Sequence, residues 1–556
     1  MGRYTLPEVY ACMFVALLLV VLVIPASTPA ATATLTPPPT STIERLKFAT
    51  TAPWIEVVLS WKGGSFATNL IVRNLAESLV DTDHRTGTLV PGLATSWEMT
   101  TPDAKTWTFK LREGVPFHFG WGELTAKDVV HTISQIVAEG IATDSGIFKT
   151  LFGRTEEEVR RSVQTPDDYT IVFKLLRPEP NLDFVLSAQA GNLLIHSKAQ
   201  WDKEGLVGTQ KRPAGTGPWQ LVEQQLGQWL LFQRVENHWR KTPEFKEFQI
   251  LFAPEDATRL AMLLSGEVHI AEVSRELHKG LIAKGMKVWN SQLPGTQAAF
   301  LLAGNYRPDS SAYDPTVPLV KTKVREAINR AINRKELRER IFQGIGEPLF
   351  VWAYHPKLPG WNPEWEQKFD EKYGYDPLRA KQLLEEAGYP QGFKTKIVIA
   401  LFPGFPETTA LGEALFNWLR AIGIQAEIEE MEFIRLREFA RGKKAHNIIW
   451  PMRTSFTPPL TILGFYNISG PTGRLFTYED KRIDEKYAQI LNSPDKAERE
   501  RLLREIGDIK FNDYAEAPLL WLPGQVVVNP KIVAEYIFPG NVDAVFTHFE
   551  YVKAAR

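Results

Sequence analysis

Apolar residues recur three and four positions apart in several stretches of the chain, which is the spacing of one face of a helix. Asp376-Pro377 begins one such stretch, because aspartate can cap a first helical turn and proline fits the first helical position. Gly388 ends the pattern, as glycine commonly does after a last turn. The predicted buried face of this helix consists of Ala380, Leu383, Leu384 and Ala387.

Two further helices are predicted from the same spacing. Thr125 can accept a hydrogen bond from the free N–H groups of a first turn, and Asp128 suits the positive end of that helix. Its apolar positions are Val129, Val130, Ile133 and Ile136. The other helix has a polar face rich in Arg, Lys and Glu. Its apolar face is formed by Val324, Ala327, Ile328, Ala331 and Ile332.

Residues 394–428 predict a strand, a helix and a second strand in succession. The apolar stretch 394–401 is typical of a buried strand, and Ile424, Ala426 and Ile428 alternate with polar residues as a second strand would. The helix between them carries its apolar face at Leu411, Leu415, Trp418, Leu419 and Ile422. A strand, helix and strand joined by short turns form a βαβ unit, so this region is expected to hold a parallel sheet.

Other alternating stretches predict antiparallel strands. Residues 107–111 and 170–175 alternate between apolar and polar side chains, and no helix of the right size for a parallel crossover separates strands of this kind. No repeat of fixed period is present. The fold class expected from these patterns is therefore mixed, with a parallel α/β part and an antiparallel α+β part.

The N-terminal 33 residues have the layout of a secretory signal. Arg3 precedes an apolar run over 11–24, Pro25 ends the run, and Ala31-Thr32-Ala33 matches a small-residue cleavage site. An uncleaved membrane anchor is the alternative, although the run is short for a membrane span. Residues 34–42 are a Thr/Pro-rich tether with too few apolar groups to fold. No later stretch approaches the length of a membrane span, so the remainder is expected to be soluble.

The composition fits a globular protein of about three structural units with a large core. Lys and Arg number 64 against 65 Asp and Glu, which gives no reason to expect nucleic acid as a partner. The 16 Trp suit either core packing or a binding cleft lined with rings. Cys12 is the only cysteine and lies before the apolar core of the leader, so no lipoprotein pattern, disulfide or cysteine nucleophile is expected.

Motifs of the common enzyme classes are absent from the sequence. It contains no G-x-S-x-G elbow, no H-E-x-x-H and no phosphate-binding Walker loop. Gly344-Ile345-Gly346 is interpreted as a turn after a helix, and His118 and His131 are interpreted as packing or surface residues. We therefore expect no catalytic activity, no bound cofactor and no metal site.

Eight short motifs occur in order along the chain: LVPGLATSWE (89–98), KTWTFKLREGVPFH (105–118), LTAKDVV (124–130), GTGPW (215–219), NHW (237–239), SGEVH (265–269), VREAINRAI (324–332) and YDPLRAKQLLEEAGY (375–389). This series resembles the family 5 extracytoplasmic solute-binding proteins of ABC transporters, whose members bind oligopeptides, dipeptides, nickel complexes and other small solutes. The fifth residue of SGEVH departs from the pattern, because His269 stands where the family has an acid. Each motif is weak alone, but eight in sequence are specific.

The resemblance implies a two-lobed periplasmic-binding-protein-like fold with an extra domain on the first lobe. The first lobe would be discontinuous, and hinge strands would join it to the second lobe. The implied ranges are 43–75, 201–298 and 508–556 for the first lobe, 76–200 for the extra domain and 299–507 for the second lobe. A solute would be trapped as the lobes close, which buries it from water and strengthens its polar contacts.

The family's peptide binders hold the ligand amine with an aspartate shortly after a tryptophan, and Trp450 matches that tryptophan. The aspartate position falls on Arg453 or, with a shift of one residue, on Thr454, and no acid lies between Glu438 and Glu479. This departure argues against an α-amine ligand. We hypothesise that Arg453 contacts an anionic or strongly hydrogen-bonding ligand, the alternative being an arginine turned to solvent or paired with a structural acid.

The resemblance also places further residues on the cleft wall. The candidate ligand-binding residues are Trp450, Arg453, Thr454, Phe456, Phe66, Asn69, Trp219, Phe402 and Phe405. Core packing is the alternative for each ring. Trp97, Trp107 and Phe117 are assigned to the core of the extra domain.

The function expected from the resemblance is capture of a small molecule, peptide or peptide-like, and its delivery to ABC permease subunits outside the cytoplasm. The protein is expected to act as a monomer, in the periplasm or at the outer face of the membrane. A membrane-anchored ligand sensor with the same fold is the first alternative, and a secreted hydrolase is the second.

Overall fold

The computed structural model describes residues 43–51, 58–59, 61–62, 66–83, 85–139, 145–190, 193–400, 405–469, 475–538 and 548–556. The predicted leader and tether, residues 1–42, lie outside the described residues. Within the described ranges, no helix combines the length and the apolar character that crossing a membrane requires.

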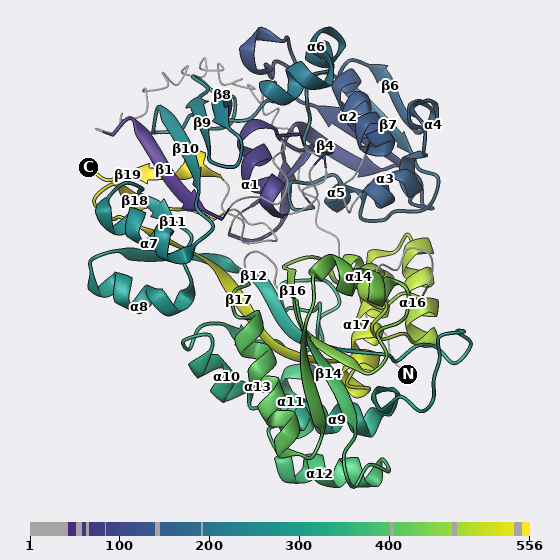
Figure 1. The fold of residues 1–556 in the computed structure, drawn as a ribbon. Helices are drawn as coiled ribbons and strands as arrows, with labels where there is room; N and C mark the ends of the chain where they lie inside the picture. Colours follow the sequence, from purple (N-terminus) through teal and green to yellow (C-terminus); the bar gives the residue numbers. More distant parts are fainter. Residues whose placement is uncertain are drawn as a thin grey trace, which may run out of the picture. The chain divides into compact units, whose positions relative to one another are not determined.

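One sheet of eleven strands runs through the predicted first and second lobes, in the order β15-β14-β16-β12-β17-β11-β1-β10-β9-β8, with β13 beside β17 (Figure 1). The first lobe contains β1 (Arg45–Thr50), β8 (Trp219–Gln225), β9 (Trp229–Arg234), β10 (Glu247–Phe252) and β11 (Ile270–Ala271). The second lobe contains β13 (Glu347–Pro348), β14 (Lys394–Ile399), β15 (Gln425–Glu430) and β16 (Ile448–Ser455).

Two long strands, β12 (Lys287–Ala303) and β17 (Glu516–Val528), connect these two groups of strands. Strands β12 and β17 pair antiparallel with each other. In addition, β17 pairs with β11 in the first lobe, and β12 pairs with β16 in the second lobe. The pairing register of β12 and β17 shifts between Asn290 and Pro294 and again before Thr296. The sheet is therefore continuous between the lobes but irregular where it passes from one to the other.

The first lobe packs helices and a short C-terminal ladder around its strands. These elements are α1 (Phe66–Leu75), α7 (Asp256–Ser265), α8 (Arg275–Ala283), β18 (Val533–Glu535), β19 (Lys553–Ala554) and the 3-10 turn η3 (Phe549–Tyr551). Strand β1 pairs in parallel with both β10 and β11, whereas β8, β9 and β10 form an antiparallel meander.

The predicted extra domain is built on a separate antiparallel sheet, β4-β5-β7-β6. Its elements are β2 (Val80–Thr82), β3 (Leu89–Pro91), β4 (Ala94–Met99), β5 (Thr106–Leu111), η1 (His118–Gly120), α2 (Ala126–Glu139), α3 (Ser145–Phe152), α4 (Glu156–Ser162), β6 (Val163–Asp167), β7 (Thr170–Lys174) and α5 (Leu182–Val185). Strands β5 and β7 pair antiparallel, as the sequence predicts. Helix α6 (Lys198–Lys211), which the predicted boundary divides, contacts α2.

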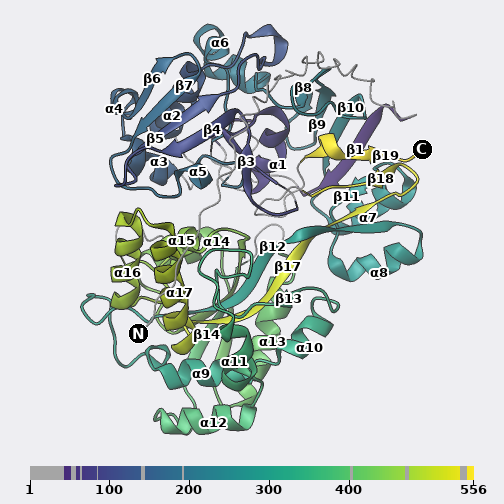
Figure 2. The ribbon, with the colours of Figure 1, turned by 180° about the vertical axis from the view of Figure 1, so that it is seen from behind.

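The second lobe covers both faces of its strands with helices. Figure 2 shows α16 and α17 lying side by side on one of these faces. The helices are η2 (Pro318–Val320), α9 (Thr322–Ala331), α10 (Arg334–Arg340), α11 (Glu364–Tyr373), α12 (Pro377–Glu386), α13 (Thr408–Ala421), α14 (Phe433–Arg441), α15 (Pro459–Tyr466), α16 (Lys481–Asn492) and α17 (Lys496–Asn512). One face packs against α9, α12 and α13, and the other against α11 and α14 to α17.

Local predictions for the second lobe are confirmed at several points. Asp376 caps α12 by accepting a hydrogen bond from the Arg379 N–H at 2.9 Å, and Pro377 occupies the first helical position. Strands β14 and β15 pair in parallel around α13, as a βαβ unit requires. Ile428 is an exception to the alternating pattern, because its side chain is exposed.

The start of α2 in the extra domain differs from its prediction. The sequence predicts that the Thr125 hydroxyl accepts from the free N–H groups of the first turn, but it donates to Asp128 Oδ2 (3.0 Å).

Candidate functional site

The carboxyl ends of the parallel strands β14 and β16 meet at one edge of the second-lobe sheet, which we call the carboxyl edge. In open α/β sheets this is the edge at which ligands bind, because the connections that follow the strands diverge there. The antiparallel strand β12 enters the lobe at the same level, since Thr296 lies opposite Ser455. Strand β17 leaves the lobe here, with Leu522 opposite Thr296.

Phe456 follows β16 at the carboxyl edge and lies among other rings. Its ring centroid is 5.1 Å from that of His355 and 5.6 Å from that of Trp521, and both pairs are edge-to-face. His355 and Trp521 also meet edge-to-face, at 5.4 Å. Such pairs add about 0.5–1.5 kcal/mol beyond the burial of their area. The three residues come from segments far apart in sequence and together form a rigid aromatic cluster.

A buried glutamine fixes the polar side of this edge. Gln297 on β12 donates from Nε2 to Thr454 Oγ1 (2.8 Å), and its Oε1 accepts from the Ala353 N–H (2.8 Å). A threonine hydroxyl has one proton and two lone pairs, and Gln297 uses only one lone pair. No acceptor for the Thr454 proton is found among the described residues. Thr454 is therefore held in place with its donor still available.

Residues of the predicted extra domain contact Phe456 from the other side. Gln189 Nε2 donates to the Phe456 carbonyl oxygen at 3.1 Å. Gly87 lies in the turn between β2 and β3, where a Cβ would come within 3.0 Å of Leu293 Cδ1 and 3.7 Å of Phe456 Cε1. Phe456 is thus a point where both predicted lobes and the extra domain converge.

Arg453 and Thr454, the two alternatives for the family's aspartate position, lie on opposite faces of β16. Arg453 pairs with Ala298, which belongs to the core beneath α9 and α13, whereas Thr454 pairs with Gln297. Arg453 is half-buried and Thr454 is 9% exposed. A ligand on the aromatic side of the carboxyl edge would therefore meet Thr454 first.

His355 also makes a hydrogen bond to a carboxylate at this edge. Its Nε2 lies 2.9 Å from Glu347 Oε1, and this hydrogen bond holds the pKa of the Glu347 carboxyl below its ordinary value. Within the described ranges, no three His, Cys, Asp or Glu side chains are grouped closely enough to hold a metal ion. Both nitrogens of His355 are used within the protein, because its Nδ1 accepts from the Lys357 N–H (3.1 Å), so the edge offers rings and a hydroxyl rather than a carboxylate cage.

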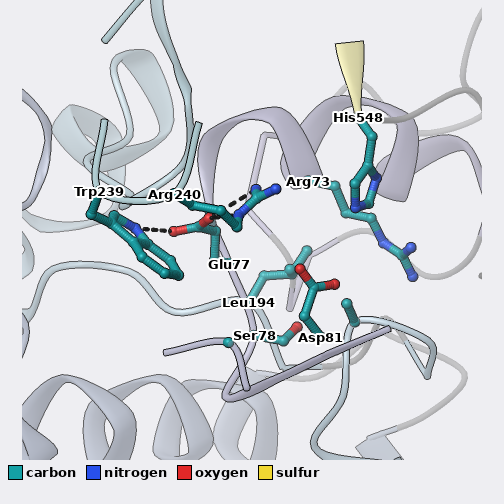
Figure 3. Close-up of a pocket in the computed structure, with 11 residues that line it drawn as sticks. Arg73, Glu77, Ser78, Asp81, Leu194, Trp239, Arg240 and His548 are labelled. Atoms are coloured by element: carbon teal, nitrogen blue, oxygen red, sulfur yellow. Dashed lines mark hydrogen bonds and ion pairs between the residues drawn. The ribbon is translucent and has the colours of Figure 1, made fainter. Parts of the chain in front are cut away.

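A pocket lies around Glu77, at a distance from the carboxyl edge in the sequence and lined by none of its residues (Figure 3). Glu77 Oε1 accepts from Arg240 Nη2 (3.0 Å), and Glu77 Oε2 accepts from Trp239 Nε1 (2.9 Å) and Thr216 Oγ1 (3.0 Å). Burial raises the pKa of Glu77 to about 7, although Arg240 lowers it. Arg240 also donates to Glu550 Oε1 (2.8 Å). These groups satisfy one another, so the pocket is best explained as a junction that ties the C-terminal segment to the first lobe.

Residues 88–474 match the model of the bacterial extracellular solute-binding proteins, family 5. This match covers well over half of the chain. The chain belongs to this family. The motifs of the sequence and the two-lobed architecture agree with that membership.

Curated relatives and solved structures of family 5 proteins match over most of the chain. The chain is 25% identical to heme-binding protein A of Haemophilus influenzae over 482 residues, which cover 82% of this chain and 83% of that protein. It is 27% identical to the dipeptide-binding protein of Escherichia coli over 380 residues, covering 65% and 66%. The DppA protein of Helicobacter pylori, solved with the peptide STSA, superposes with a TM-score of 0.71 at 22% identity and covers 92% and 98%. These neighbours are two-lobed binding proteins, and the solute-binding proteins of family 5 are periplasmic.

Four family-based candidates lie in hydrophobic cores, and Phe456 is one of them, because it is 2% exposed in the same core as Trp450. Trp219 is fully buried on β8, with its ring centroid 5.5 Å from that of Phe248. Trp450 is buried under the helices that cover one face of the second lobe, and Phe405 is buried on the opposite face. In each case the packing alternative describes the side chain. The sequence could not distinguish these positions, because an aromatic residue is equally suited to a cleft wall and to a hydrophobic core.

The remaining candidates differ in what can be described. Phe66 and Asn69 begin α1, and their side chains lie outside the described part of the structure. Phe402 lies outside the described residues. Sequence reasoning missed Gln189, Gln297 and His355. Only Gln297 carried a signal, because it is a lone amide at the start of the apolar run 298–303.

Proposed function

We propose that the chain captures a small peptide or peptide-like solute between its lobes and delivers it to the permease of an ABC importer. The observation that carries this proposal is the convergence at Phe456. A ring cluster and an oriented hydroxyl from the second lobe meet an amide from the extra domain at the edge where ligands bind in such sheets.

The chemistry of the edge restricts the solute. Rings at Phe456 and Trp521 suit apolar side chains, and the Thr454 hydroxyl suits a carbonyl or carboxylate oxygen. No carboxylate stands at the position where the family's peptide binders hold the ligand amine. We therefore propose a solute that presents apolar side chains to the rings and a hydrogen-bond acceptor to Thr454, whereas Arg453 lies on the other face of β16.

Delivery to a permease requires the protein to act outside the cytoplasm. The leader-like residues 1–33 support export, and family membership supports a periplasmic location. Binding without chemical change is the simplest use of this site, since the relatives that match are binding proteins.

Native mass spectrometry of the purified protein, followed by calorimetry with a defined mixture of synthetic di-, tri- and tetrapeptides, tests the proposal. We expect a co-purified small molecule or a saturable peptide signal. Phe456→Ala should weaken binding by at least tenfold, because truncating an aromatic residue that anchors a ligand typically costs about 2 kcal/mol or more of binding free energy. Glu429→Gln, at a half-buried surface carboxylate of β15 away from the carboxyl-edge rings, is the control. Recovery of chemically altered peptide at catalytic yield would contradict a pure binding role.

A further inference from the structure

Arg275, the first residue of α8 in the first lobe, is tied to one of the connecting strands. Its Nε donates to Gln525 Oε1 on β17 at 2.8 Å. Gln525 Nε2 in turn donates to Asn290 Oδ1 on β12 at 2.8 Å. The guanidinium is therefore oriented by both strands that link the lobes, and its fixed fork limits where the remaining N–H groups point.

The free end of this guanidinium reaches a residue of the second lobe. Arg275 Nη1 donates to Glu407 Oε1, and Glu407 stands immediately before α13. The side chains of Arg275 and Glu407 are only 14% and 8% exposed. A charge pair this far from water is weakly screened by salt, and loss of one partner leaves the other charge buried and unpaired.

The pair lies beside the irregularly paired part of the link between the lobes, where Arg275 Nη2 is 3.5 Å from the Pro523 carbonyl oxygen. Leu-Pro-Gly occurs on both connecting strands, at 293–295 and 522–524, and Pro294 lies opposite Pro523. Proline cannot donate a ladder hydrogen bond, so the pairing is interrupted on both strands at one level. The pairing register also shifts on either side of Pro294. Bending is therefore expected here, and a bend here changes the separation of Arg275 and Glu407.

We propose that Arg275 and Glu407 form an inter-lobe latch that favours the closed arrangement of the lobes and so sets solute affinity without touching the solute. This inference rests on the proposed function. A solute binds in proportion to the population of the closed form, so a contact made only in that form raises the apparent affinity. The two residues are thus positioning residues rather than ligand contacts.

The latch can be tested without any solute, by measuring inter-lobe distances with paired spin labels. Cys12 is the only cysteine, so a Cys12→Ser background with Val207→Cys on α6 and Leu378→Cys on α12 places one label on each side. Both label sites are well exposed, at 80% and 73%. The full-length protein would be freed of bound solute by unfolding in guanidinium chloride and refolding.

We expect the long-distance population to grow severalfold in Glu407→Gln and in Arg275→Gln relative to the parent. Glu429→Gln, which removes the exposed Lys396–Glu429 pair inside the second lobe, should leave the distribution unchanged. Arg275→Gln/Glu407→Gln should open the lobes less than the sum of the two single variants, because neither charge is then left alone. Additive effects, or a parent-like distribution in Glu407→Gln, would overturn the latch.

The same variants separate the latch from the proposed function. If the peptide mixture binds the parent, Glu407→Gln should weaken that binding by at least tenfold, because loss of a contact between buried charges lowers the population of the closed form. If no peptide binds the parent but the solute-free distances still shift in the variants, the latch stands and the proposed solute class fails. If peptides bind parent and variant equally while the distances shift, closure does not set affinity and the inference fails.

Discussion

The two lobes bury their ionisable groups in different ways. The first lobe and its extra domain bury histidines as well as the Arg240 cluster: burial lowers the pKa of His118, His131 and His238 to about 4 and of His196 to about 3. The second lobe extends past its predicted end at residue 507, because the end of α17 packs in its core, and it buries Lys510, which contacts Glu516 at 3.0 Å. A neutral imidazole in a core becomes unfavourable in acid, whereas a buried ion pair depends on both partners being present. Acid should therefore destabilise the first lobe, whereas removal of one charged residue should destabilise the second lobe.

Removal of Lys510 is the largest single effect that this comparison predicts. Its side chain is 0% exposed and also donates to Asn467 Oδ1 (2.9 Å), while Glu516 is 3% exposed. Lys510→Met leaves the Glu516 carboxylate buried without its cation, which should lower the free energy of unfolding by about 3–5 kcal/mol. Urea denaturation followed by tryptophan fluorescence measures this loss.

The double variant Lys510→Met/Glu516→Gln is the control for that experiment. It should recover much of the loss, because no net charge then remains in the core. A loss below about 1 kcal/mol in Lys510→Met would mean that the pair is not buried as described.

Acid should destabilise the first lobe through its histidines, with an effect of about 2 kcal/mol from His196 alone at pH 5. The unfolded imidazole has its ordinary pKa of 6.5, and burial lowers the pKa in the folded protein to about 3. Protons therefore bind the unfolded chain first, so this stability is present above pH 6.5 and is lost as the pH falls toward 3. At pH 5 the protonation favours unfolding by about 1.36 kcal/mol for each of 1.5 pH units.

His196→Phe tests this assignment, since the ring packs edge-to-face with Trp61 at a centroid distance of 5.0 Å and phenylalanine keeps that packing. The variant should lose less stability than the parent between pH 7 and pH 5 in denaturant titrations. Parallel losses in the two proteins would show that His196 does not drive the acid response.

Local structure was predictable from sequence where a short motif determined it. Asp376-Pro377 predicted the start of α12, and the apolar spacing of 394–428 predicted β14, α13 and β15. These elements depend on capping, periodicity and turns within one segment. The family motifs extended the prediction to the two-lobed fold, which the comparisons confirm.

The candidate site was less predictable, because it depends on long-range register. Phe456 and Gln189 are 267 residues apart, and nothing near either residue indicates the other. Arg453 and Thr454 looked equivalent in sequence, yet a strand places neighbours on opposite faces. Trp219 and Trp450 matched family positions but lie in cores, because aromatic residues serve both purposes.

Gln297→Leu tests the polar contacts that hold Thr454 on the second-lobe side of the site. Leucine leaves the buried Ala353 N–H without its acceptor, which should cost about 1–3 kcal/mol of stability. It also releases Thr454, so solute binding should weaken more than stability alone explains. Calorimetry of the folded variant with the peptide mixture measures the second effect, and unchanged affinity would exclude Thr454 as a positioned donor.

Gly87→Ala tests the first-lobe side of the same contact and has the smallest expected effect. The residue has a φ of +72°, a region in which alanine costs about 1–2 kcal/mol. Its Cβ would also press on Leu293 Cδ1 at 3.0 Å, beside the irregular part of β12. Gly114→Ala is the matched control, because its φ of +74° carries the same backbone cost while no atom lies within 4 Å of its Cβ. Both variants should lose similar stability. Only Gly87→Ala should lengthen the spin-label distances, because only its Cβ would approach Phe456 of the second lobe. Equal distances in the two variants would contradict the contact between Gly87 and Phe456.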